Sequence, residues 1–187
     1  MLNDVKVQKS TCERYDLRWD RFGWATFAID EAGGIFNCQS DHGNYNHHWP
    51  HHGRKTFKHF LIELARDPQY LMEKVSEKTY FNFDANLGEW KRTVLQMRKD
   101  KELTKEQAKD VWDFLRDELG DYSRSPEIIQ KEIYEHWPFN AIINEPWYCF
   151  EVNLDYPPEA HIFAKEVMPM FADVLKKELG AEMQADK

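Results

Sequence analysis

Apolar and polar residues alternate with a period of two near the start of the chain. The alternation is strict over residues 14–20, where every second side chain is charged. The apolar positions of this segment are Tyr15, Leu17 and Trp19. Successive side chains of a β-strand point to opposite faces of the sheet. The pattern therefore predicts a strand with one buried face.

Two further segments extend this strand into an antiparallel meander. Residues 24–30 place alternate apolar side chains on one side, and residues 35–40 do the same. Between them lie Gly33 and Gly34, and paired glycines supply the positive φ angles that tight hairpin loops need. A fourth strand is a further candidate, through residues 45–49 after a turn at 41–44.

Helical spacing replaces alternation in the middle of the chain. Apolar residues recur at three- or four-residue intervals from Phe57 to Leu64, and again along the charged segment 87–99. Thr104 and Gln107 have the spacing of a capping box, in which each end residue hydrogen-bonds to the other's backbone. The helix that they open is expected to end at Gly120.

The C-terminal part is predicted to hold one more strand and a final helix. Residues 147–154 (WYCFEVNL) are rich in aromatic and β-branched residues, which favour a strand that could join the N-terminal sheet. Pro158 then opens a helix expected to end at Gly180. Pro169 lies inside this helix and is expected to kink or split it, because proline lacks a backbone N–H.

Together these elements predict one α+β domain over residues 1–187. A sheet of three or four antiparallel strands would pack against several α-helices. The expected division is mainly β over 1–54, mainly α over 55–140, a strand within 145–154 and a helix at 158–180. A chain of 187 residues is of ordinary length for one domain.

Composition narrows the classes of function. The net charge of −8 argues against nucleic acid as a partner, because phosphates require an excess of Lys and Arg. The three cysteines, which are odd in number and widely spaced, predict no disulfide framework and a reducing, cytoplasmic setting. No apolar run approaches the roughly 20 residues that span a bilayer, so we expect no membrane association.

Six of the eight histidines fall within residues 36–60. Zinc takes imidazole and thiolate ligands, and the candidate ligands by proximity are His42, His47, His51 and His52. Their spacing matches no standard zinc motif, and Pro50 separates the two histidine pairs. Zinc is thus the one metal to consider, and we expect no cofactor.

Three functional hypotheses remain from the residues. The first is protein binding through an irregular segment that carries aromatic and basic side chains, since Trp, Tyr and Arg anchor many interfaces. Its candidate contact residues are Tyr45, His48, Trp49, Arg54, Lys55 and Lys58. The second is a metal-dependent or nucleotide-processing enzyme that uses the cluster from His42 to His59. The third is a small-ligand-binding module with an enclosed pocket beside the histidines. Core packing is the competing interpretation for Trp49.

A resemblance adds to these hypotheses. The pattern SDHGNY at 40–45, Trp49, FKxFL at 57–61, and YLxxKV at 70–75 resembles small accessory proteins encoded by tailed bacteriophages and prophages. It covers residues 24–76 and brings no activity, cofactor or catalytic residue with it. This chain departs from the pattern in its histidines at 47–52, where related chains tend to have Tyr or Arg.

The resemblance implies a class of function. Phage accessory proteins commonly bind host machinery and inhibit or redirect it, and this class includes anti-defence proteins such as anti-CRISPRs. It implies a non-catalytic protein that binds a host or phage protein in the host cytoplasm. The partner and the oligomeric state do not follow from the sequence.

Overall fold

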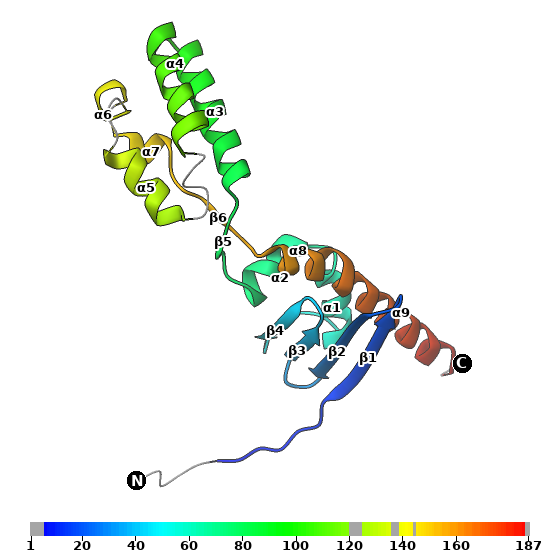
Figure 1. The fold of residues 1–187 in the computed structure, drawn as a ribbon. Coiled ribbons are helices and arrows are strands. Elements are labelled where there is room, and N and C mark those ends of the chain that lie inside the picture. The colour runs from blue at the N-terminus through cyan, green and yellow to red at the C-terminus, as the bar shows by residue number, and fades with distance from the viewer. Residues whose placement is uncertain (1–5, 120–124, 136–138, 144, 186–187) are drawn as a thin grey trace. The chain divides into compact units, whose positions relative to one another are not determined.

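The computed structural model describes residues 6–119, 125–135, 139–143 and 145–185 (Figure 1). The chain forms two compact units. Unit 1 consists of residues 1–78 and 156–187, and unit 2 consists of residues 79–155. Unit 2 is thus an insertion in the sequence of unit 1. The sequence patterns had placed no boundary at residues 78 or 156.

Unit 1 contains a four-stranded antiparallel sheet with the strand order β1-β2-β3-β4. The strands are β1 (Glu13–Trp19), β2 (Gly23–Asp30), β3 (Ile35–Ser40) and β4 (Gly43–His48). The predicted meander is confirmed, including its fourth strand. The hairpin at the paired glycines requires Gly34 itself, because Gly34 has φ +70° and a Cβ there would lie 2.1 Å from the carbonyl oxygen of Trp49.

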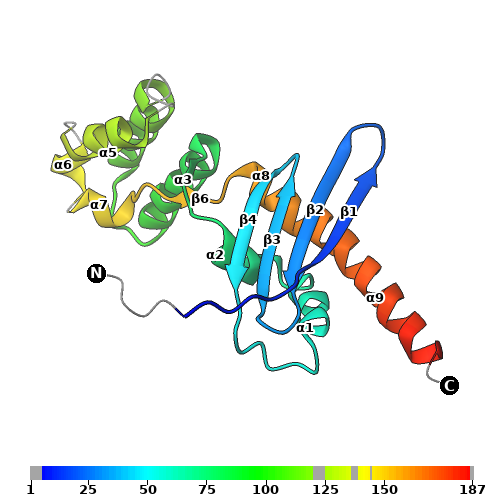
Figure 2. The same cartoon turned by 90° about the horizontal axis from the view of Figure 1, so that it is seen from below.

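Helices cover one face of this sheet, as Figure 2 shows. They are α1 (Phe57–Leu64), α2 (Pro68–Val75), α8 (Pro158–Ile162), the π-helical turn η3 (Phe163–Val167) and α9 (Met168–Ala185). Aromatic stacking joins the two layers. The ring of Phe27 lies 3.9 Å from that of Phe171, and Tyr45 lies at the same distance from Phe163. The α+β class is confirmed, with the sheet's inner residues and these helices forming one core.

The C-terminal helical segment runs from Pro158 to Ala185 with a π-helical turn in its middle. Within this turn the backbone N–H of Met168 bonds to the oxygen of Phe163, five residues earlier. The wider turn stands directly before Pro169, which has no N–H to continue the regular pattern. The predicted end at Gly180 is wrong, because the helix continues past it to Ala185. Among the described residues, none of the helices combines the length and the apolar character needed to cross a bilayer.

Unit 2 is mainly helical. Its described elements are β5 (Tyr80–Phe81), α3 (Phe83–Lys99), α4 (Lys105–Asp113), the π-helical turn η1 (Phe114–Glu118), α5 (Pro126–Glu135), α6 (Phe139–Ile142), α7 (Pro146–Cys149) and β6 (Leu154–Asp155). The predicted capping box is confirmed, with both hydrogen bonds between Thr104 and Gln107 present. The predicted helix end at Gly120 lies outside the described residues.

The strand predicted at 147–154 is wrong over most of its length. Residues 146–149 form the short helix α7, and only Leu154–Asp155 is a strand, which pairs with β5 and not with the N-terminal sheet. Side chains of α3 take the place of a neighbouring strand here. Asn86 hydrogen-bonds to both the N–H and the oxygen of Asn153, and Trp90 Nε1 donates to the oxygen of Glu151. Backbone groups of Glu151 and Asn153 are therefore satisfied by side chains and not by a neighbouring strand.

Candidate binding face of the N-terminal sheet

The face of the sheet opposite to the helices is lined by alternate residues of the four strands. Strand register places these residues in rows that cross the sheet. One row is Asp16, Thr26, Gln39 and Asn44. The next row is Arg14, Ala28, Asn37 and Asn46. All eight are exposed or half-buried, so this face is open within unit 1.

The centre of the open face is free of charge. We call it the amide face and define it by the members of these rows on β2, β3 and β4: Thr26, Ala28, Asn37, Gln39, Asn44 and Asn46. These positions are uncharged in a chain of which 31% of residues are charged. Depletion of charge at the centre with charge at the rim is the usual pattern of protein interfaces.

Two shallow hollows mark this surface, and both are bordered by Asn37. One of about 310 Å³ lies between Asn37, Thr26 and Arg14. The other, of about 440 Å³, lies between Asn37, Asn46 and His48. Both are open to solvent, unlike the enclosed pocket that the small-ligand hypothesis predicts beside the histidines. Amide side chains donate and accept hydrogen bonds, so this surface can pair with polar groups of a partner.

Strand β1 supplies a charged rim to the amide face. Arg14 Nη2 lies 3.0 Å from Asp16 Oδ1, and Thr26 Oγ1 donates to the same oxygen at 2.7 Å. Two hydrogen bonds hold the pKa of Asp16 below its usual value. The one from Thr26 has the larger effect, and the one from Arg14 has the smaller. The carboxylate of Asp16 is therefore charged at neutral pH and is held against the sheet.

The turn between β1 and β2 adds aromatic and basic groups at one end of the face. Phe22 is 83% exposed, and the guanidinium of Arg21 lies 5.7 Å from its ring centre. Arg18 lies over the ring of Trp24 in the same way, at 5.8 Å. Together with Asp20 these residues border a shallow hollow of about 510 Å³. Such cation–π pairs suit a partner with acidic or planar groups.

The six residues predicted to form a contact surface are divided by the structure. Tyr45, Trp49 and Lys58 are buried, with 6%, 7% and 7% of their surfaces exposed. Tyr45 and Trp49 pack in the core of unit 1, as the competing interpretation for Trp49 held. The indole Nε1 of Trp49 finds no hydrogen-bond partner within the described chain.

The other three predicted contact residues are exposed. His48 borders the amide face, and its Nε2 lies 2.9 Å from the oxygen of Gly33. Arg54 forms an ion pair with Glu63, and Lys55 is exposed in the loop before α1. Only His48 therefore joins the open face of the sheet, while Arg54 and Lys55 belong to the segment that leads into α1.

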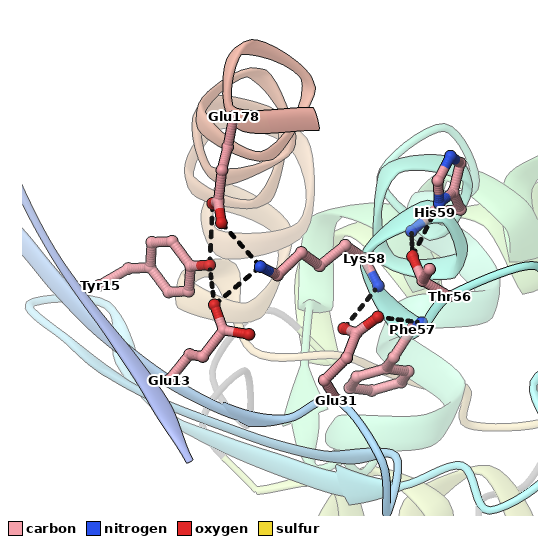
Figure 3. A network of polar contacts seen from close by, with 8 residues as sticks. All are labelled: Glu13, Tyr15, Glu31, Thr56, Phe57, Lys58, His59 and Glu178. Carbon is pink, nitrogen blue, oxygen red and sulfur yellow. Dashed lines mark hydrogen bonds and ion pairs between the residues drawn. The ribbon is translucent and has the colours of Figure 1, made fainter. Parts of the chain in front are cut away.

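Lys58 is the centre of a polar network that joins three elements of unit 1 (Figure 3). Its Nζ lies 2.7 Å from a carboxylate oxygen of Glu13 on β1 and 2.7 Å from one of Glu178 on α9. The hydroxyl of Tyr15 contacts both carboxylates, at 2.6 and 2.9 Å. Burial lowers the pKa of Lys58, but its hydrogen bonds to Glu13, Glu178 and Tyr15 outweigh this effect, so the pKa lies above its usual value.

A carboxylate also caps the start of α1. Glu31 accepts hydrogen bonds from the backbone N–H groups of Phe57 and Lys58, at 3.0 and 3.2 Å (Figure 3). Thr56 is the N-cap and accepts from the N–H of His59. A negative charge at a helix N-terminus is favourable because the helix dipole is positive there. Lys58 and His59 are therefore structural parts of this junction.

The four candidate histidines do not converge on a metal site. No group of three or more His, Cys, Asp or Glu side chains in the described residues is placed to hold a metal ion. The candidate ligands, all of them described, are His42, His47, His51 and His52. His47 packs against Trp49 with ring centres 4.4 Å apart, and burial lowers its pKa. His52 Nδ1 accepts a hydrogen bond from the backbone N–H of Arg54.

Cys38 and Cys149 lack the setting of a catalytic thiol. Cys38 is buried on the inner face of β3, and burial raises its pKa to about 12. The pKa of Cys149 is also raised, mainly by burial and to a smaller extent by the negative charge of Glu102. A nucleophilic cysteine needs a lowered pKa so that the thiolate forms near neutral pH. The geometry of these two residues thus favours packing over chemistry.

The amide face was missed in the sequence, although a signal for it was present. The outer positions of β2, β3 and β4 alternate with the apolar positions from which the strands were predicted. Their lack of charge can be read from the sequence once the strands are assigned. The aromatic residues of 36–60 lie largely in the core, and His48 and His52 bond to local backbone.

Comparison with known families identifies the family of this chain. A family model described as a phage family matches residues 5–177. The chain belongs to this family. The match agrees with the resemblance of residues 24–76 to phage-encoded proteins and extends over both units of the phage protein. Searches among curated proteins and among solved structures each gave no match.

Proposed function

We propose that this phage protein is a non-catalytic accessory protein that binds a host or phage protein through its amide face. The observation that carries the proposal is the uncharged centre of the open sheet face, which includes Asn37, Gln39, Asn44 and Asn46. A surface without function would be expected to carry the charge that the rest of the chain carries. Exposed amides on a rigid sheet instead provide fixed hydrogen-bond donors and acceptors.

The charge of this face favours a protein over a nucleic acid. Nucleic acid binding relies on Lys and Arg that are free to neutralise phosphates. Arg14 is paired with Asp16, the centre of the face has no cation, and Arg18 and Arg21 lie only at one end of it. A protein partner that offers backbone or side-chain hydrogen bonds at its centre and charges at its rim matches this distribution.

Inhibition of host defence is a more specific form of the proposal. It is supported by the phage family and by what accessory genes of phages commonly encode, and not by any residue of the face. The test is plating of an isogenic phage with and without the gene on hosts that carry or lack a CRISPR–Cas system. If the deletion phage plates less well than the wild-type phage only on the host with CRISPR–Cas, this form of the proposal is supported. If the two phages plate equally on that host, it is ruled out.

Binding through the amide face is tested with a double variant. Asn37→Arg combined with Asn46→Arg places two charges at directly paired positions of β3 and β4. Both side chains are exposed, so the fold should be retained. Partners from infected cells are captured on the immobilised wild-type protein, identified by mass spectrometry, purified and titrated. We expect the double variant to weaken the interaction at least about tenfold, as buried unpaired charges do at interfaces.

Two control variants locate the contact. Gln69→Arg makes a matched amide-to-arginine change on an exposed position of α2, on the helical side of the sheet, and should leave affinity unchanged. Arg54→Glu tests the segment first predicted as the contact surface. If Arg54→Glu abolishes binding and the double variant does not, the amide face is not the binding site.

A further inference from the structure

Strand β1 is an unprotected edge of the sheet. It lies at the end of the strand order, so one of its sides has no neighbouring strand in unit 1 (Figure 2). It is paired with β2 at all seven of its residues without a bulge, and it contains no proline or glycine. Proteins usually protect such edges with proline, bulges or repelling charges, because exposed edges pair with other strands.

The outward charges of β1 alternate in sign: Arg14, Asp16 and Arg18. An antiparallel copy of the strand, with Leu17 on the two-fold axis, places Asp16 opposite Arg18 of the copy. The same pairing occurs a second time by symmetry. Arg18 lies over the ring of Trp24 and donates to the oxygen of Leu17, but it forms no ion pair with another residue of the described chain. Asp16 of the copy would supply one.

The inward side chains select the same register. With Leu17 on the axis, Leu17 meets Leu17 of the copy, and Tyr15 meets Trp19. All three are partly buried residues that pack against the core of unit 1. The register centred on Tyr15 would also pair opposite charges, but it places Glu13 opposite Leu17. The register centred on Asp16 sets like charges against each other, which is unfavourable for directly opposite residues.

Helix α9 extends the surface beyond the backbone edge. Both ribbon views show it crossing the helix-covered face of the sheet and continuing past β1 (Figures 1 and 2). Phe171 of this helix packs against Tyr15, and Glu178 bonds to the Tyr15 hydroxyl. A copy related by the axis would bring its own α9 to the same layer. Helix contacts would then add to an interface that strand pairing alone would leave small.

We propose that this phage protein forms a symmetric dimer in which the β1 strands of two copies pair antiparallel about Leu17. The result is one continuous eight-stranded sheet with helices on one face. The partner is a second copy of this chain, chosen by the self-complementary charges of β1. This proposal does not depend on the function of the amide face, although the dimer would present two amide faces on the same side.

Charge reversal tests the register. Asp16→Arg alone sets the introduced arginine against Arg18 of the copy, and Arg18→Asp alone sets two aspartates together. Sedimentation of each variant over a wide range of protein concentration should show a dissociation constant raised about tenfold or more over that of the wild type. Mixing the two variants should restore dimers, because every cross-strand pair is then of opposite charge. Restoration also shows that both variants are folded.

The matched control is Arg14→Asp mixed with Asp16→Arg. In the proposed register this mixture keeps one repelling pair for each attracting pair, so it should stay largely monomeric. Restored dimers in this mixture would overturn the register about Leu17. A monomeric wild type at the highest attainable concentration would overturn the proposal, as would single variants that dimerise like the wild type. The same outcomes leave partner binding by the amide face untouched.

Discussion

The two units of this phage protein satisfy their buried polar groups by different means. Unit 1 relies on strand pairing and on one charged network, in which Lys58 joins carboxylates from both ends of the chain. Unit 2 relies on a neutral side chain, Asn86, which bonds to the backbone of Asn153 in place of a strand. A charged network depends on pH and an amide contact does not, so the two units should respond differently to the same perturbation.

Charge is also divided unequally between the units. Residues 79–155 contain 16 Asp and Glu but only 10 Lys and Arg, so unit 2 carries most of the net charge of −8. The sheet unit is close to neutral by comparison. An acidic surface that attracts a basic partner would therefore belong to unit 2, whereas the amide face of unit 1 is suited to recognition through hydrogen bonds.

The largest expected effect is in the core of unit 1. Phe27 is fully buried and stacks on Phe171 at 3.9 Å, so Phe27→Ala leaves a cavity between sheet and helices. Such changes cost about 3–5 kcal/mol of the free energy of unfolding. Hydrogen exchange of the variant should show lost protection in β1–β4 with protection retained in α3. Equal loss in both would contradict separate units.

Lys58→Met tests the charged network. It removes the cation and leaves Glu13, Glu178 and the Tyr15 hydroxyl without their common partner. Because both carboxylates are partly exposed, we expect a loss of about 2 kcal/mol in place of the larger cost of breaking a fully buried pair. Chemical denaturation measures it. Lys165→Met in the π-helical turn η3, where Lys165 is exposed, serves as the control and should be neutral.

Asn86→Ala provides the corresponding test in unit 2. Asn86 is 3% exposed, and its removal leaves the N–H of Asn153 without its bond. Asn153 is an exposed residue, so water can partly replace the lost bond, and we expect a loss of about 1 kcal/mol, the net contribution of a typical hydrogen bond. We expect exchange at Asn153 and along α3 to accelerate while β1–β4 stay protected. Thermal unfolding that shifts β1–β4 as much as α3 would show instead that the units unfold together.

The smallest expected effect is a difference in pH dependence. Burial raises the pKa of Glu13, but hydrogen bonds from Lys58 and Tyr15 outweigh this, so its pKa in the folded state lies below the ordinary value. The associated stability is present above the unfolded pKa of about 4.3 and is lost as pH falls through the lower folded pKa. Unit 1 should therefore weaken below about pH 4. The same titration of Lys58→Met should show a smaller decline, and an unchanged decline would contradict the assignment.

Local patterns in the sequence were sufficient for much of the fold. Strict alternation identified β1, and Thr104 with Gln107 identified the start of α4, because both signals lie within a few residues of the structure that they specify. The strand prediction for 147–154 failed because the composition of this segment favours a strand. Its backbone instead bonds to side chains of α3, more than sixty residues earlier. Distant contacts of this kind leave no local signal.

The candidate site shows the same limit. Whether Lys58 is a contact residue or a buried one depends on Glu178, which lies 120 residues away. Nothing near Lys58 in the sequence indicates that partner. The amide face, in contrast, follows from strand register and from the absence of charge, both of which can be derived once the strands are correct.

The insertion of unit 2 also affects how the protein is made. The β-strands of unit 1 leave the ribosome first. The hydrogen bond from Tyr15 to Glu178 can form only after 163 more residues have been synthesised. Residues 79–155 hold their own core and can close before that point. Domains usually fold in the order of synthesis. We expect the reverse order here, with the inner face of the sheet incompletely covered until the last helix emerges.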